Sequence, residues 1–481
     1  MNHTRQALRA LLLTGALALP SLAQARTAHE AELEARLEKL EGEMIALKAD
    51  LQAARQQQAE TAQAASLAQA QATGIAAAAA KAEAVEKRVA SLEARPTPPA
   101  EGFRDGNTTV RLGGYLKLVA TNSRFSGGEM ANNTQGRDFW LPQSIPVGKG
   151  PASRDQDFSA RQTRLWLNFA SDIAGHAVKG YVETDFETTP NTSASVTGGG
   201  NQRTTNGYTL ALRRAWMQVD KWTFGQDWTT FQYTGALPES TDYVGTTEGT
   251  VFVRQPLVRY SQALSKELTL HVAAENPETA SASLGAPALT ENGDDHLPDA
   301  TARLAYAGKI GELSLAGLAR QLRVQNGALS DTRFGWGLSA AGKLYLSTDR
   351  VSDLRFMATY GNGAGRYIGV NFAPDAVLDP ASGQLHGVST FAAMAALRLG
   401  IASGLRANLM GSYQHVRYAD DIAAASIATY NREAWSVAGN LFWSPVRNID
   451  LGIELRHGQR KLVNGGSGKL DRVEFAAKYG F

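Results

Sequence analysis

Alternation of apolar and polar residues with a period of two constrains the fold of this chain more than any other feature. It begins at Phe103 and continues to the C-terminus, where Val473 and Phe475 alternate with Arg472 and Glu474. A period of two places the apolar side chains on one face of a strand and the charged ones on the other. No run of 18 or more apolar residues occurs in this region, so no membrane-spanning helix is expected. The pattern predicts strands that each have one apolar and one polar face.

The lengths of the connections between these segments alternate as well. Short turns such as 220–221 and 445–448 alternate with long loops, which is typical of a transmembrane barrel. The predicted long loops span roughly residues 125–158, 190–207, 230–250, 276–298, 326–331, 362–387, 417–432 and 458–469. Residues 103–481 are therefore predicted to form an all-β transmembrane barrel of about 16 antiparallel strands. Repeated soluble β-sandwich domains are the alternative, but they do not explain the alternation of loop lengths.

The first 25 residues have the three parts of a secretory signal peptide. Arg5 and Arg9 precede the apolar stretch 11–19, and Ala23-Gln24-Ala25 supplies the small residues of a cleavage site. We predict that residues 1–25 are removed and that the remaining chain is exported. An exported barrel of this kind is expected in the outer membrane of a Gram-negative bacterium, with the membrane lipid as one partner.

Residues 26–95 have the composition of a long helix, rich in Ala, Glu, Gln, Leu and Lys. Apolar residues recur at alternating steps of four and three from Leu33 to Ala54. A single solvated helix with so narrow an apolar stripe would bury nothing, so we predict a periplasmic α-helical coiled coil that joins chains, preferably three. A disordered Ala/Gln-rich spacer is the alternative for residues 53–84. The Pro-rich linker 96–102 ends the helix.

The charge balance and the motif content exclude several classes of function. Lys and Arg number 48 against 46 Asp and Glu, without a large basic patch, so no nucleic-acid partner is expected. The chain has no Cys, which excludes disulfides and thiolate metal sites. Hydrolase and phosphate-binding motifs are absent, so we expect no enzyme, no cofactor and no metal. Two alternatives remain, an outer-membrane hydrolase centred on His271 and a structural tether or adhesin that the barrel anchors.

Six short blocks in the first half of the barrel region carry a resemblance to a known family. They are 159–165 (Ser-Ala-Arg-Gln-Thr-Arg-Leu), 212–218, 225–231 (Gly-Gln-Asp-Trp-Thr-Thr-Phe), 236–239, 254–260 and 274–277. With these blocks, the coiled coil and the terminal Phe481, the chain resembles the DcaP-like outer-membrane porins. The resemblance implies a homotrimer of sixteen-stranded channels that favour small dicarboxylates and related organic anions. The strand that ends in Phe481 resembles those read by the outer-membrane insertion machinery, which is a further expected partner.

The composition of the barrel region favours anionic solutes because most of its basic residues are Arg, and not because its net charge is large. Residues 102–481 contain 27 Arg and 10 Lys against 34 acidic residues. The guanidinium group of Arg fits a carboxylate with two hydrogen bonds, and rings of Arg in a lumen favour anions. Individual arginines could instead be paired with acidic residues of the lumen. By strand parity, the predicted lumen lining consists of Arg111, Lys179, Glu183, Asp185, Arg303, Arg355, Arg398 and Arg456.

The third long loop is predicted to fold into the barrel and to narrow it. Its two acidic residues would then oppose arginines of the second, fourth and sixth strands, and the opposed charges would orient a dipolar solute. The predicted constriction consists of Arg164, Arg213, Arg259, Glu239 and Asp242. Parity slips near Arg213 and Arg214, so either could face the lumen. An ordinary surface loop is the alternative for the third loop. The sequence thus predicts a channel for passive diffusion of small organic anions.

Overall fold

The computed structural model describes residues 102–132, 134–148, 150–188, 205–327 and 329–481, together with residues 36, 39, 42–44, 48, 66 and 69. The chain forms two compact units, 1–100 and 101–481. In the first unit the described residues are helical and exposed, and Lys39 lies 3.9 Å from Glu43. The predicted signal peptide and most of the predicted apolar seam lie outside the described residues. No helix among the described residues is long and apolar enough to cross a membrane.

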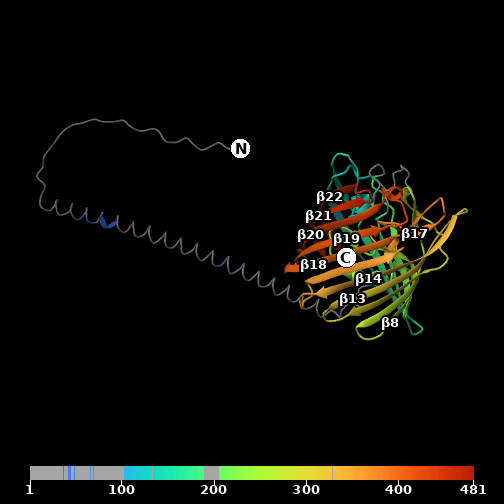
Figure 1. Ribbon diagram of the computed structural model, residues 1–481. Helices are drawn as coiled ribbons and strands as arrows, with labels where there is room; N and C mark the ends of the chain where they lie inside the picture. The colour runs from blue at the N-terminus through green and yellow to red at the C-terminus, as the bar shows by residue number, and fades with distance from the viewer. Residues whose placement is uncertain are drawn as a thin grey trace, which may run out of the picture. The chain divides into compact units, whose positions relative to one another are not determined.

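The second unit is an antiparallel sheet that closes into a barrel (Figure 1). The barrel has sixteen strands. β2 (Thr108–Phe125) pairs with β22 (Ser467–Gly480) and so closes the barrel. β3 (Ser153–Ser159) and β4 (Arg164–Ile173) pair with successive parts of β2 and together form one interrupted strand. The other barrel strands are β5 (His176–Asp185), β6 (Ala211–Val219), β7 (Trp222–Trp228), β8 (Arg254–Ala263), β9 (Leu268–Glu275), β12 (Asp299–Ala307), β13 (Gly311–Asn326), β14 (Leu329–Tyr345), β15 (Asp353–Asn362), β18 (Ser389–Ala402), β19 (Leu405–Arg417), β20 (Asn431–Trp443) and β21 (Ile449–Leu462). The short β1 (Phe103–Asp105) pairs only with the start of β2.

The two faces of the sheet follow the period of two in the sequence. On β22, Val473 and Phe475 are exposed on the outside of the barrel, whereas Arg472 and Glu474 are buried inside it. The apolar outer face can contact lipid, and because the sheet closes on itself, each barrel strand has a paired neighbour on both sides along part of its length. The predicted barrel and its strand parity are therefore confirmed.

Short turns join the strands at one end of the barrel and longer loops at the other. At the short-turn end, Asp220 (φ 50°) and Asn448 (φ 72°) adopt the left-handed backbone that tight turns require. Two of the predicted long loops are wrong. β13 and β14 remain paired up to Asn326 and Leu329, and β21 and β22 up to Lys461 and Ser467. Residues 326–331 and 458–469 are thus mostly the ends of two long hairpins.

Five of the six remaining long loops carry short elements of their own among the described residues. We name them L1 (126–152), L2 (186–210), L3 (229–253), L4 (276–298), L6 (363–388) and L7 (418–430). They contain η1 (Gln135–Arg137) and η2 (Pro142–Ser144) in L1, η4 (Thr234–Ala236) and η5 (Thr247–Gly249) in L3, β10 (Ala280–Ser283) and β11 (Ala286–Glu291) in L4, η6 (Gly365–Tyr367), β16 (Ala376–Leu378) and β17 (Leu385–Gly387) in L6, and η7 (Ala424–Ile427) in L7. The L4 and L6 strands form a separate four-stranded sheet in the order β11-β10-β16-β17.

Large apolar side chains from these loops form cores within the long-loop end. Phe231 of L3 and Tyr367 of L6 pack edge to face with ring centroids 5.8 Å apart, and both are fully buried. Trp140 of L1 packs with Phe125 and Leu470 of the wall. These apolar contacts hold the loops in defined positions against the inner wall. The polar side chains of the lumen alone would not provide this packing.

Candidate functional site

L3 lies inside the barrel, against inward-facing side chains of the wall. Arg303 on β12 donates a hydrogen bond to the carbonyl of Gln232 at 2.7 Å. Further along the loop, the carbonyl of Glu239 accepts a hydrogen bond from the Asn440 side chain on β20 at 2.9 Å. The Glu454 carboxylate on β21 then accepts one from the Thr241 amide at 3.2 Å. L3 begins after β7 and ends at β8. Between these ends it contacts β20 and β21, which lie far from β7 and β8 in the strand order of the barrel.

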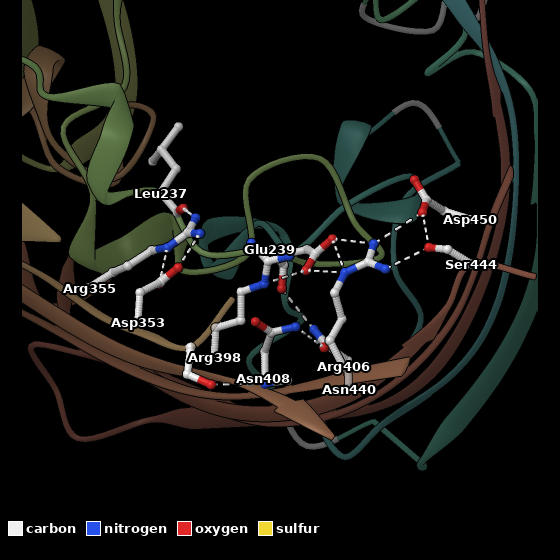
Figure 2. Close-up of polar contacts among 12 residues, drawn as sticks. Leu237, Glu239, Asp353, Arg355, Arg398, Arg406, Asn408, Asn440, Ser444 and Asp450 are labelled. Carbon is white, nitrogen blue, oxygen red and sulfur yellow. Dashed lines mark hydrogen bonds and ion pairs between the residues drawn. The ribbon is translucent and has the colours of Figure 1, made fainter. Parts of the chain in front are cut away.

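Glu239 is held by two arginines of the wall (Figure 2). Arg406 on β19 binds both carboxylate oxygens, with Nη2–Oε1 at 2.6 Å and Nε–Oε2 at 2.8 Å. Arg398 on β18 lies 3.4 Å from Oε2. Arg406 also contacts Asp450 on β21 at 3.1 Å. Nearby, Arg355 donates to the Leu237 carbonyl at 2.5 Å and so fixes the same stretch of L3.

Asp242 connects L3 to L1 rather than facing a wall arginine. Its carboxylate accepts a hydrogen bond from the Trp140 amide at 2.8 Å, and others from the amides of Val244 and Gly245 at 2.6 and 2.7 Å. Lys117 on β2 approaches its carbonyl at 3.4 Å. Glu239 and Asp242 are thus bound by groups other than Arg164, Arg213 and Arg259, and their opposition to these arginines across the lumen stays a prediction.

Arg164 and Arg213 share two carboxylates with each other. Arg213 Nε lies 2.7 Å from Glu183, and its Nη1 lies 2.6 Å from Asp185. Arg164 lies 3.7 Å and 3.3 Å from the same two acidic residues. The ring of Tyr243 on L3 lies against both guanidinium groups, with centroid distances of 5.5 Å for Arg164 and 4.8 Å for Arg213. L3 is thus in direct contact with this part of the wall through an aromatic ring.

A register shift explains the parity slip that the sequence shows on β6. Glu183 pairs with Arg214, but the next residue, Thr184, pairs with Leu212. Arg213 is the extra residue of a β-bulge, which turns the side chains of both arginines inward. Arg213 is only 2% exposed, whereas Arg214 is 22% exposed. Both face the lumen, but only Arg214 is accessible to a solute.

Asp227 on β7 links the two remaining accessible arginines. Arg214 Nε lies 2.6 Å from one of its oxygens, and Arg259 Nη1 lies 3.0 Å from the other. Arg259 also donates to the Thr230 hydroxyl at 2.8 Å. The ring of Trp228 lies 5.1 Å from the guanidinium of Arg254 on β8. We name this group of residues on β4–β8 the wall cluster: Arg164, Glu183, Asp185, Arg213, Arg214, Asp227, Arg254 and Arg259.

The other predicted lumen residues all lie on the inner face of their strands. Arg111 and Lys179 are exposed there, and Arg303, Arg355 and Arg398 hold L3 as described. Arg456 is buried and pairs with Glu454 at 2.6 Å. Sequence reasoning did not assign Asp227 or Arg254 to the site, although Asp227 lies within the block 225–231 and Arg254 begins the block 254–260. No cluster of three metal-ligating side chains occurs among the described residues.

Comparison with known proteins places this geometry in a family. Residues 142–481 match the family model described as DcaP outer membrane protein. The chain belongs to the DcaP outer membrane protein family. It is therefore an outer-membrane channel of the porin type, and not an enzyme. The hydrolase alternative is set aside by this result. Within the barrel, His271 contacts Ser261 at 2.9 Å, as an ordinary hydrogen-bonded pair of the wall.

A solved structure shares the fold of this DcaP family member, and two further porin structures match more weakly. The outer membrane channel DcaP of Acinetobacter baumannii is 24% identical, with a TM-score of 0.65, and the match covers 79% of this chain and 99% of that one. An anion-selective porin from Comamonas acidovorans is 11% identical with a TM-score of 0.47, covering 78% and 100%. OmpT of Vibrio cholerae is 10% identical with a TM-score of 0.47, covering 79% and 100%. A comparison with curated proteins found no match to this sequence.

Proposed function

We propose that this DcaP family porin passes small organic anions, with dicarboxylates as the preferred class, along the wall cluster. The observation that supports this most directly is the local balance of charge. The cluster contains five guanidinium groups against three carboxylates, an excess of two positive charges. Guanidinium groups bind carboxylates with two parallel hydrogen bonds, and basic residues in a pore favour anions.

The exposed members of the cluster are the ones that a solute would contact. Arg164, Arg214 and Arg259 are 18%, 22% and 12% exposed. They lie on β4, β6 and β8, so a solute with two carboxylates could contact two of them together. Arg213 is buried and instead supports the carboxylates that orient its neighbours. Glu239 and Asp242, which the sequence analysis assigned to the constriction, would act by fixing L3 opposite this wall.

The test is the zero-current potential of the full-length protein in a planar bilayer across a potassium chloride gradient. We expect anion preference for the parent and a clear shift toward cations when Arg214→Gln and Arg259→Gln are combined. Arg417→Gln is the matched control, because Arg417 is an exposed arginine paired with Asp420 on the loop rim. An unchanged potential in the double variant would overturn the proposed solute path. A barrel without conductance would instead favour the structural tether.

We further propose that residues 1–25 direct export, that residues 26–95 form a periplasmic coiled coil followed by the linker 96–102, and that three chains associate. The four-three spacing of apolar residues from Leu33 to Ala54 supports association between chains. The exposed aromatic side chains of Tyr479 and Phe481 at the end of β22 support recognition by the insertion machinery. In this arrangement the short turns are periplasmic and the long loops are extracellular.

A further inference from the structure

A cavity of about 380 Å³ lies at the long-loop end, away from the wall cluster. L1, L4, L6, L7, the start of β20 and the end of β21 contribute to its lining. Pro287, Ala288 and Leu289 of the β11 edge form one side, and Phe372 of L6 and Tyr430 of L7 form another. A volume of this size lies at the lower end of the range of small-molecule sites and suits a solute with one ring.

The apolar wall of this cavity consists largely of aromatic rings whose polar ends are already engaged. Tyr418 and Tyr430 pack edge to face with centroids 5.5 Å apart. The Tyr418 hydroxyl donates to the Asn431 carbonyl at 2.7 Å, and the Tyr430 hydroxyl donates to the Ala286 carbonyl at 3.1 Å. The same hydroxyl reaches the Ser283 carbonyl, so L4 is fastened to L7 across the mouth. The rings therefore present carbon surface, and not hydroxyl groups, to the cavity.

Arg460 also lines this cavity, and its positive charge is not neutralised. Its Nε donates to Asn431 Oδ1 at 2.7 Å, and its Nη1 donates to the carbonyls of Gln143 and Ile145 at 2.7 and 2.9 Å. All these acceptors are neutral, and among the described residues no carboxylate lies within ion-pair distance of Arg460. Arg460 Nη2 has no hydrogen-bond partner among the described residues. A partly buried guanidinium normally has an acidic partner, because a charge removed from water is costly when it is unpaired.

Two neutral acceptors in the same cavity are also unused. Gln143 Oε1 and Asn371 Oδ1 are buried and have no hydrogen-bond partner among the described residues. Buried polar atoms are nearly always hydrogen-bonded, so an unpaired pair of them beside one cavity calls for a donor. The cavity thus combines one positive group, two acceptors and an aromatic wall.

We propose that this cavity is a second binding site, which takes a small aromatic carboxylate that also carries an O–H or N–H donor. The carboxylate would bind Arg460 Nη2, the ring would lie against Phe372 and the tyrosines, and the donor would reach Gln143 or Asn371. The site is separate from the wall cluster and does not depend on the proposed ion selectivity. In the proposed orientation it would bind the solute at the outer mouth, before entry into the barrel.

The test is isothermal titration of the purified full-length protein in detergent with 4-hydroxybenzoate. The methyl ester of the same compound lacks the charge, benzoate lacks the donor, and inorganic phosphate lacks the ring. We expect 4-hydroxybenzoate to bind, benzoate to bind several-fold more weakly, and the ester and phosphate at least about tenfold more weakly. Equal binding of the ester or of phosphate would overturn the assigned ligand class. Absence of binding by 4-hydroxybenzoate up to its solubility limit would overturn the site.

Two variants locate the binding. Arg460→Gln removes the positive charge, and Ala288→Trp fills the cavity from the exposed β11 at a residue that is not a hydrogen-bond partner of Arg460. Each is expected to weaken binding at least about tenfold. Arg417→Gln at the end of β19 is expected to bind like the parent. If Arg460→Gln disturbs L1, Ala288→Trp still decides the outcome. Parent-like binding by Ala288→Trp would overturn the proposal.

Discussion

Arg406 and Glu239 form a two-pronged ion pair that joins the wall of the barrel to the loop inside it, across 167 residues of sequence. Arg398 stands on the other side of the same carboxylate at 3.4 Å. Glu239 therefore neutralises part of the positive charge of the wall on β18 and β19. The pair also fixes the position of L3, which places Tyr243 against Arg164 and Arg213.

Replacing Glu239 by Gln is expected to increase anion preference. The substitution keeps the hydrogen bond from Asn440 to the main-chain carbonyl, so L3 remains inside the barrel. It leaves one additional uncompensated positive charge in the lumen. A unit charge attracts an anion at about 4 Å in water by about 1 kcal/mol, which corresponds to about a fivefold change in the chloride to potassium permeability ratio. The measurement is the zero-current potential across a salt gradient. Glu433→Gln, which changes the net charge equally at a pair near the rim, is the control. A ratio equal to that of the parent would contradict the prediction.

Replacing Arg213 by Met is expected to destabilise the barrel by about 3–5 kcal/mol, because Glu183 and Asp185 would lose their closest positive partner in a buried site. Urea unfolding of the detergent-solubilised protein measures this loss. Arg214→Met, at a position that is more exposed, is expected to cost less. Adding Glu183→Gln and Asp185→Asn to Arg213→Met should restore part of the stability. If the triple variant is no more stable than Arg213→Met, the unpaired carboxylates are not the cause.

The strands were predictable because their signal is local. Each residue of β22 alternates with its neighbour, so its two faces can be assigned without knowledge of any other strand. The hairpin ends were not predictable in the same way. Residues 463–466 (Val-Asn-Gly-Gly) favour a turn, but how far the flanking residues stay paired depends on the partner strand. The sequence therefore predicted the number of strands better than the residues at which the strands end.

The candidate site was predictable in its residue types but not in its pairings. Parity identified Arg164 and Arg259 as residues of the lumen, because their own strands carry that information, whereas Glu239 was assigned through the predicted inward fold of its loop. The partner of Glu239 is set by how L3 crosses the barrel, and no local pattern connects it to Arg406. The bulge at Arg213 depends on the register between β5 and β6, so the inward position of both Arg213 and Arg214 required the paired strands.

Changing Leu40 and Leu47 to Asp is expected to abolish association through the proposed coiled coil, because charges would occupy positions of the apolar seam. The barrel of residues 101–481 is a compact unit of its own, so channel conductance should persist. Sedimentation of residues 26–95 as an isolated peptide, parent against variant, measures the association, and single-channel recording measures conductance. Exposed substitutions at Lys39 and Glu43 to Gln are the control. An isolated parent peptide that remains monomeric would contradict the proposed coiled coil.

Glu187 at the start of L2 is expected to make the contact between this loop and Arg161 depend on pH. Burial raises the pKa of Glu187 from 4.5 to about 8, and the nearby Asp138 adds to the rise while Arg161 opposes it. Both oxygens of Glu187 are buried without a hydrogen-bond partner among the described residues, which fits a carboxyl group that prefers to be protonated. The contact between the start of L2 and Arg161 is therefore most stable when Glu187 carries its proton.

The sign follows from the raised pKa. Below pH 4.5 the carboxyl group is protonated whether the contact is open or closed, so its contribution is fully present. Between pH 4.5 and about 8 the open form releases the proton and the closed form retains it, so the contact weakens as the pH rises, by up to about tenfold per unit. Above about pH 8 the loss is complete and levels off. Hydrogen exchange of the Phe186 amide, which donates to the Arg161 carbonyl, measures this after correction for the intrinsic rate. Glu187→Gln should show protection that does not change across this range, and a parent with equally flat protection would contradict the assignment.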